Sequence, residues 1–241
     1  MHTSGECRRS PPPITAWVAA GAALVAATMA HAQAPRPEPG DVDLATSRVY
    51  VFVGKTGLGH DHAVVGALQA GRVTLDATER AGTLVFDMRS FRADTADARK
   101  VLGLAGETDA GTQKQVTDNM LGGDVLDVAR HPTATFEIRS SLRSPRSAPG
   151  RHPVYDLAGA FTLHGVTREV VIPVEAEHLG PVVRLKGGFA VRQTDFGMKP
   201  YATFGGMVGV ADELRIYGDL RVVAMPAALP AAPLQPAGAA P

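Results

Sequence analysis

Cysteine is almost absent from this chain of 241 residues: Cys7 is the single example, and it lies in an N-terminal segment that we expect to be removed. Without thiols, the mature chain can form no disulfide, and cysteine is excluded as a nucleophile or metal ligand. The chain also has no formal net charge, because its 24 basic residues balance its 24 acidic ones. A neutral chain gives no electrostatic reason to expect nucleic acid as a partner.

One long apolar run is present, close to the N-terminus. Two arginines precede residues 14–29 (ITAWVAAGAALVAATM), and an Ala-His-Ala triplet follows as the small-x-small pattern of a signal-peptidase site. The run of about 16 residues is short for a membrane-spanning helix. We therefore predict a signal peptide over residues 1–32, a periplasmic or secreted protein, and a mature chain that begins at Gln33 with no transmembrane anchor.

The ends of the mature chain differ in composition from its middle. Residues 33–42 are interpreted as a short leader. Residues 225–241 are mainly Ala and Pro and carry no charge, a composition that packs no core and predicts a disordered tail. Residues 43–224 remain as one domain of about 180 residues.

Apolar and polar residues alternate through most of this domain. In residues 133–139, Ala134, Phe136 and Ile138 share one face and polar side chains occupy the other. Such alternation is typical of antiparallel sheet that is covered on one side. The strands predicted in this way span residues 48–54, 63–69, 71–77, 82–88, 133–139, 154–163, 169–177, 183–192 and 214–222.

These strands predict an all-β domain, either a closed barrel or a sandwich. Glycines within the strand runs, such as Gly159 and Gly187, indicate the bends that barrel closure requires. With about eight strands, a barrel interior is either filled by side chains or holds one small ligand.

One segment, residues 112–121, departs from the alternation. Val116 and Met120 lie at helical spacing, and Thr112 with Gln115 matches a capping box. We expect one short α-helix here, covering an end of the barrel. The polar residues 92–111 that precede it are predicted to be a long loop.

Three further segments follow one another along the chain. DVLDVARHPTATF (124–136) leads from the predicted helix into a strand, LHGVTREV (163–170) forms a hairpin, and FAVRQTDFGM (189–198) ends a strand. Together they resemble the YceI-like family over residues 43–224. The resemblance implies an antiparallel lipocalin-like β-barrel of about eight or nine strands, whose tunnel binds a polyisoprenoid or similar lipid. It implies a binding protein that is not an enzyme and has no cofactor.

The inward faces of the predicted strands agree with an apolar ligand, because they carry almost no charge. Each buried CH₂ group contributes about 0.8 kcal/mol, so a chain of isoprene units needs shielding from water. An apolar or amphipathic small molecule is the expected partner. The sequence does not distinguish a monomer from a homodimer. Strand parity, the alternation of inward-facing and outward-facing residues along each strand, assigns the following residues to the tunnel: Leu75, Leu84, Phe86, Met88, Phe136, Ile138, Phe161, Leu163, Ile172, Val174, Leu185, Phe189, Leu214 and Ile216.

Two histidines flank an aspartate between the first two predicted strands, in GLGHDHAVVG (57–66). In an extended segment His60 and His62 point to the same side, so they are candidates to contact a ligand head group at the tunnel mouth. A purely structural turn is the plainer interpretation. We predict no catalytic residue and no metal.

Metal chemistry at this turn is nevertheless an alternative. His60 and His62 could belong to a metal-binding protein or a metal-dependent enzyme, although zinc usually has three or four protein ligands. His131 and His164 are candidates to complete such a set, and the sequence does not show that they converge. A further alternative is a filled barrel whose outer loops bind another protein.

Overall fold

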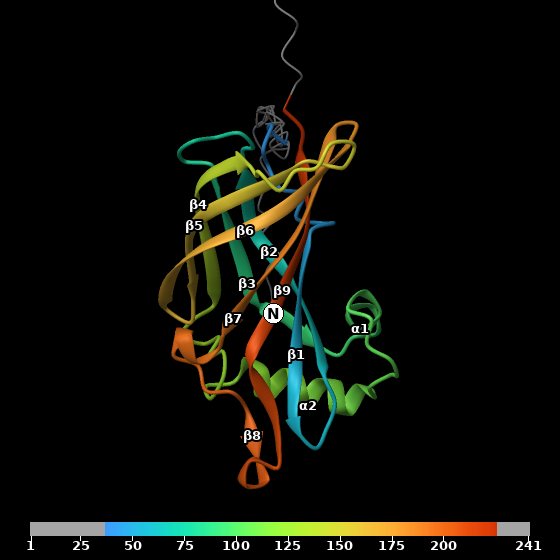
Figure 1. Ribbon diagram of the computed structural model, residues 1–241. Helices are drawn as coiled ribbons and strands as arrows, with labels where there is room; N and C mark the ends of the chain where they lie inside the picture. Colours follow the sequence, from blue (N-terminus) through green and yellow to red (C-terminus); the bar gives the residue numbers. More distant parts are fainter. Residues whose placement is uncertain (1–36, 226–241) are drawn as a thin grey trace, which may run out of the picture. The chain divides into compact units, whose positions relative to one another are not determined.

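A closed antiparallel sheet is the main element of the computed structural model, which describes residues 37–225 (Figure 1). The sheet has nine strands. The short β8 pairs only with β9, and the pairing of β1 with β9 closes the other eight into a barrel. The bounds are β1 (Arg48–Gly57), β2 (His62–Val73), β3 (Gly82–Ala93), β4 (Thr133–Arg143), β5 (Val154–Leu163), β6 (Val166–Leu179), β7 (Val182–Arg192), β8 (Ala202–Thr203) and β9 (Val208–Val223).

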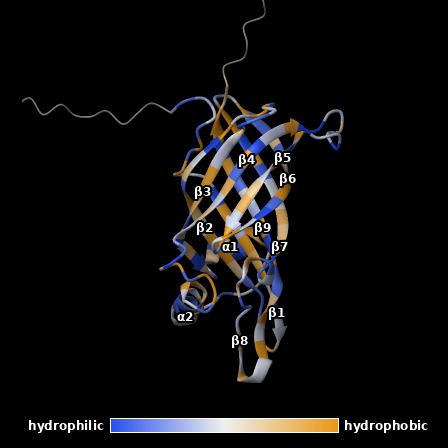
Figure 2. Ribbon diagram, turned by 90° about the vertical axis from the view of Figure 1, so that its left-hand side faces the viewer, coloured by the Kyte–Doolittle hydropathy of each residue, from blue (hydrophilic) through white to orange (hydrophobic). Residues whose placement is uncertain are grey.

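The all-β, lipocalin-like barrel expected from the sequence is therefore confirmed. Along β5, every second residue from Tyr155 to Leu163 is buried, and the residues between them are only partly buried. Figure 2 shows the same alternation of hydrophobic and hydrophilic residues on the strands. The predicted signal peptide and nearly all of the predicted tail lie outside the described residues.

Two details of the predicted strands are wrong. Residues 63–69 and 71–77 do not form separate strands, because β2 runs through the whole of the first segment and ends at Val73, within the second. Two register shifts between Val65 and Ala70 mark bulges, which interrupt the alternation and so conceal the continuous strand. The two-residue strand β8 is too short to produce a recognisable pattern.

The helical region also differs in part from the prediction. Helix α1 (Ala96–Val101) lies in the segment that was expected to be a loop. Helix α2 (Ala110–Leu121) begins two residues before the predicted helix, and its N-cap is Asp109, whose carboxylate accepts a hydrogen bond from the backbone N–H of Thr112 (3.0 Å). The capping box predicted at Thr112 is therefore wrong.

Helix α2 lies at one end of the barrel (Figure 1). Its residues Val116, Met120 and Leu121 pack against the buried core, as the sequence predicted. The backbone of residues 40–42, which had been assigned to the leader, pairs with Gly71 and Val223 at the opposite end. None of the helices within residues 37–225 is long and apolar enough to cross a bilayer.

Gly159 allows close approach of β5 to β4, and its replacement is expected to destabilise the barrel. A Cβ atom at this position would collide with the carbonyl oxygen of Glu137. We expect Gly159→Ala to lower the free energy of unfolding by about 1–3 kcal/mol, the usual cost of overpacking. Urea denaturation measures this change. Gly218→Ala is the matched control and should have a much smaller effect, because the nearest atom to its new methyl group is 3.9 Å away.

Candidate functional site

A cavity of about 440 Å³ occupies the interior of the barrel. This volume falls within the range of about 300–1,000 Å³ that is usual for small-molecule sites. All eight strands of the closed ring contribute apolar side chains to its wall, and no Asp, Glu, Lys or Arg from residues 37–225 lines it. The wall therefore favours an apolar occupant over a charged one.

Most residues that strand parity assigned to a tunnel line this cavity. Leu75 and Ile138 do not. Leu75 follows the bulged strand β2 and packs against the core elsewhere, whereas Ile138 is buried beside a register shift in β4. The predicted residues that line the cavity are Leu84, Phe86, Met88, Phe136, Phe161, Leu163, Ile172, Val174, Leu185, Phe189, Leu214 and Ile216.

Strand β1 supplies lining residues that the sequence did not reveal. Val49, Val51 and Val53 line the cavity, whereas Phe52 lies on the outer face, with the guanidinium carbon of Arg215 4.8 Å from its ring centroid. Because both faces of β1 are apolar, parity alone could not identify the inner one. The outward cation–π contact explains how an aromatic ring is accommodated there.

The two ends of the barrel differ. At the end opposite α2, Val73, Tyr155 and Val183 are buried in the core and do not line the cavity, so side chains close it there. At the α2 end, the lining includes Leu58, which is 64% exposed, and Tyr201, which is 37% exposed. The cavity therefore opens beside α2, the β1–β2 turn and the β8–β9 hairpin.

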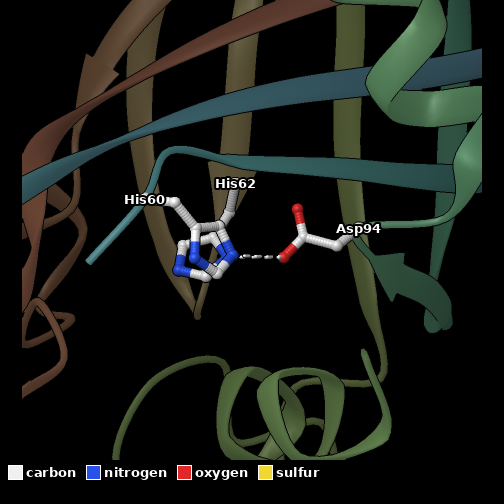
Figure 3. A group of neighbouring side chains, drawn as sticks. All are labelled: His60, His62 and Asp94. Atoms are coloured by element: carbon white, nitrogen blue, oxygen red, sulfur yellow. Dashed lines mark hydrogen bonds and ion pairs between the residues drawn. The ribbon is translucent and has the colours of Figure 1, made fainter. Parts of the chain in front are cut away.

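His60 lies at this mouth in the turn between β1 and β2, His62 is the first residue of β2, and both line the cavity. Their ring centroids are 4.6 Å apart, and Figure 3 shows the two rings lying against each other beside Asp94. His62 Nδ1 is 2.6 Å from Asp94 Oδ2, and His60 Nε2 is 3.5 Å from the same oxygen. Asp94, which directly follows β3, was not recognised in the sequence, because an isolated aspartate after a strand carries no distinctive pattern.

Asp94 is completely buried, and groups from separate segments bind its carboxylate. Its Oδ1 accepts hydrogen bonds from the backbone N–H of Ala63 (3.0 Å) and from Arg99 Nη1 of α1 (3.1 Å). Burial raises the pKa of Asp94, but the hydrogen bonds from His62, Ala63 and Arg99 outweigh it and lower the pKa to about 2. Asp94 is therefore ionised at neutral pH.

The ionised carboxylate determines what His62 can offer a ligand. Because a carboxylate only accepts hydrogen bonds, the Nδ1 atom of His62 must carry the proton that faces Asp94. The other ring nitrogen, Nε2, is then available for a hydrogen bond with a ligand. Gln115 and Asn119 of α2 also line the cavity and add amide groups at the mouth.

The metal alternative can be examined on the same side chains. Within residues 37–225, His60, His62 and Asp94 form the one group with three ligand atoms close enough to hold a metal ion, all within 4.8 Å of one another. However, Arg99 already neutralises Asp94, so a divalent cation would add uncompensated positive charge. His131 and His164 do not complete the set, since their rings pack on each other, with centroids 4.4 Å apart.

Comparison with known proteins decides the family. The YceI-like domain matches residues 41–222, which is most of the chain. The chain belongs to the YceI-like family. The resemblance found in the sequence is thereby confirmed, and no curated protein matches this YceI-like chain.

Two solved structures are similar to this YceI-like protein. BcnA from Burkholderia cenocepacia is 21% identical, with a TM-score of 0.50, and the match covers 76% of this chain and 100% of BcnA. A polyisoprenoid binding domain from Saccharophagus degradans is 14% identical, with a TM-score of 0.51, and the match covers 78% of this chain and all of that one. At these identities the likeness establishes the fold.

Proposed function

We propose that this YceI-like protein binds one isoprenoid, or a similar amphipathic lipid, inside its barrel and acts as a carrier without enzymatic activity. The observation that supports this most directly is the cavity: its wall is uncharged, one end is closed, and polar side chains gather at the mouth. The similar structure from Saccharophagus degradans is described as a polyisoprenoid binding domain, which supports the choice of an isoprenoid.

The distribution of polar groups gives the ligand an orientation. The apolar tail would lie among residues such as Leu157, Leu185 and Leu220, deep in the cavity. The head group would lie at the mouth, where the Nε2 atom of His62 can form a hydrogen bond. A hydroxyl group, which both donates and accepts hydrogen bonds, fits this position better than a quaternary ammonium group, which does neither.

Titration with a short-chain prenol tests this proposal. Protein from which bound lipid has been extracted should bind the prenol saturably, at one molecule per chain, with a Kd in the micromolar range or below. A matched alkane without the hydroxyl should bind more weakly, because it leaves the polar groups at the mouth unpaired. Folded protein that binds neither compound would contradict the proposal.

Replacing both histidines at the mouth is expected to weaken binding only modestly. His60→Ala with His62→Ala should lower prenol affinity by about 1–2 kcal/mol, the contribution of one or two head-group hydrogen bonds. Isothermal titration calorimetry measures this change. His131→Ala with His164→Ala is the matched control, since these residues lie outside the cavity lining and should leave affinity unchanged.

A metal-binding function is the second candidate, and the close approach of His60, His62 and Asp94 favours it. Two imidazole nitrogens and a carboxylate oxygen form a donor set that transition metals accept. Metal analysis of the wild type and of the double histidine variant separates the two candidates. One tightly held ion per wild-type chain, absent from the variant, would favour the metal function.

We also propose that the protein acts after export. The basic start, the apolar run and the small-x-small triplet at residues 30–32 support this proposal. N-terminal sequencing of protein from the native host should begin at Gln33. Recovery of the intact chain from the cytoplasm alone would contradict export.

A further inference from the structure

Three large apolar side chains remain exposed beside the cavity mouth. Leu58 is 64% exposed, Met207 61% and Phe204 76%. They are neighbours through the backbone, because the N–H of Leu58 donates to the carbonyl of Met207 (2.9 Å) and the N–H of Met207 donates to that of Phe204 (3.3 Å). We call these three residues the apolar tip. Clustered apolar groups of this kind mark a surface that contacts a partner.

The apolar tip continues the wall of the cavity. Leu58 itself lines the cavity, as do Tyr201 and Val208 on either side of the tip, whereas Phe204 and Met207 do not. The hairpin between β8 and β9 projects beyond the end of the barrel at which α2 lies (Figure 1). Apolar side chains therefore lie both on this hairpin and at the cavity mouth beside it.

The backbone at the tip presents Phe204 outward at a conformational cost. Phe204 has a φ of 50°, and Gly205 and Gly206 follow with φ values of 66° and 91°. A bulky residue in the left-handed region has a strained backbone. Because the Phe204 ring is mostly exposed, packing within this chain does not offset that strain. Contact with an external apolar phase would offset that strain.

The charges around the tip indicate the chemistry of the partner. The charged residues that flank the tip are Lys55 and Lys199, both exposed, and Asp61 and Asp212, both partly buried. The two carboxylates accept hydrogen bonds from the backbone N–H groups of Lys55 and Thr194, so the exposed charges beside the tip are cationic. A lysine near an anionic membrane surface is attracted to it. Apolar side chains flanked by cationic ones are what an anionic bilayer surface binds.

We propose that the apolar tip inserts into the surface of an anionic lipid bilayer and holds the cavity mouth against it. Lipid could then pass between bilayer and barrel without crossing water. This role rests on the proposed lipid-binding function for its purpose, but the docking itself depends only on the tip and its lysines.

Tryptophan fluorescence gives a direct test, because Trp17 is the only tryptophan of the chain and lies outside the described residues. The chain from Gln33 onward, which is the expected mature protein, contains no tryptophan, and a single one is introduced into it by Phe204→Trp at the tip. A matched variant carries Leu142→Trp, at a position that is 45% exposed near the opposite end of the barrel. Vesicles of phosphatidylcholine and phosphatidylglycerol in equal parts are then added.

We expect the emission of the tryptophan at position 204 to shift to shorter wavelength and to be quenched by brominated lipid. The tryptophan at position 142 should show neither effect. High salt or vesicles of phosphatidylcholine alone should weaken the response, because they remove the attraction of the lysines. No quenching at position 204, or equal quenching at both positions, would overturn the proposal.

A second measurement removes the tip without touching the cavity wall. Phe204→Asp with Met207→Asp should lower vesicle binding by about tenfold or more, since interfacial affinity scales with the apolar area inserted. Leu142→Asp with Leu179→Asp is the control and should leave vesicle binding unchanged, as these exposed residues lie at the other end.

The outcomes separate docking from lipid binding. The tip variant should bind short-chain prenol in solution as tightly as the wild type, because neither side chain lines the cavity. Vesicle docking by a wild type that binds no prenol would support the docking and contradict the proposed function. A solution dimer that the tip variant dissociates, with no vesicle binding, would overturn the docking and assign the tip to a second copy of this chain.

Discussion

Gly218→Phe is expected to abolish lipid binding while leaving the barrel folded. Gly218 lines the cavity on β9, with the same inward parity as Ile216 and Leu220. A Cβ atom there would meet nothing closer than 3.9 Å, so a side chain can enter the cavity without colliding with the backbone. A phenyl ring in this space displaces several CH₂ groups of a bound chain, each contributing about 0.8 kcal/mol.

Prenol titration measures this effect, and we expect affinity to fall by more than about a hundredfold, which corresponds to roughly 3 kcal/mol. Ala190→Phe is the matched control, because it adds the same bulk at an exposed position on β7. Its affinity should equal that of the wild type. Undiminished binding by Gly218→Phe, with circular dichroism unchanged, would place the ligand outside the barrel.

Asp94→Asn is expected to produce the largest loss of stability among single isosteric changes at the mouth. The substitution removes the charge that compensates Arg99, whose side chain is only 9% exposed. Breaking one side of a buried ion pair typically costs about 3–5 kcal/mol. Urea denaturation at neutral pH measures the loss. Adding Arg99→Met should recover part of it, since the unpaired buried charge is then gone as well.

An exposed ion pair provides the control for this variant. Lys114 and Asp118 pair at i,i+4 on the outer surface of α2, and both side chains are more than half exposed. Asp118→Asn should therefore change stability by less than about 1 kcal/mol. A loss as large as that of Asp94→Asn would show that burial is not the cause.

The pH dependence of stability follows from the same carboxylate. The pKa of Asp94 falls from its ordinary value of 3.8 to about 2 in the folded protein, because the hydrogen bonds of its carboxylate outweigh burial. A lowered folded pKa stabilises the protein above pH 3.8, and that contribution is lost as the pH falls from 3.8 to about 2. The contribution amounts to about 2 kcal/mol. The stability difference between wild type and Asp94→Asn should accordingly narrow over this interval.

The barrel could be predicted because inward and outward residues alternate along strands such as β5, where burial follows sequence parity without interruption. Prediction failed where the register shifts. The bulges of β2 moved Leu75 out of the lining, and the two apolar faces of β1 concealed its three inward valines. Bulges depend on pairing between distant strands, so a local pattern does not reveal them.

The residues at the cavity mouth could likewise be predicted only in part from the sequence. His60 and His62 were recognisable as a pair in the sequence. Their environment, however, depends on Asp94, which follows His62 by 32 residues, and on Arg99 beyond it. The pairing of β2 with β3 brings Asp94 beside the start of β2, and α1 then supplies the guanidinium. The ion pair between Asp94 and Arg99 is therefore visible only in the fold.

Native mass spectrometry of protein purified from its own host tests the central claim most directly. The account predicts a second species, heavier than the polypeptide by the mass of one lipid molecule and returned to the polypeptide mass by organic extraction. The Gly218→Phe protein, purified in the same way, should show the polypeptide alone. A wild-type protein that carries a metal ion and no lipid, and that takes up no prenol afterwards, would contradict the account.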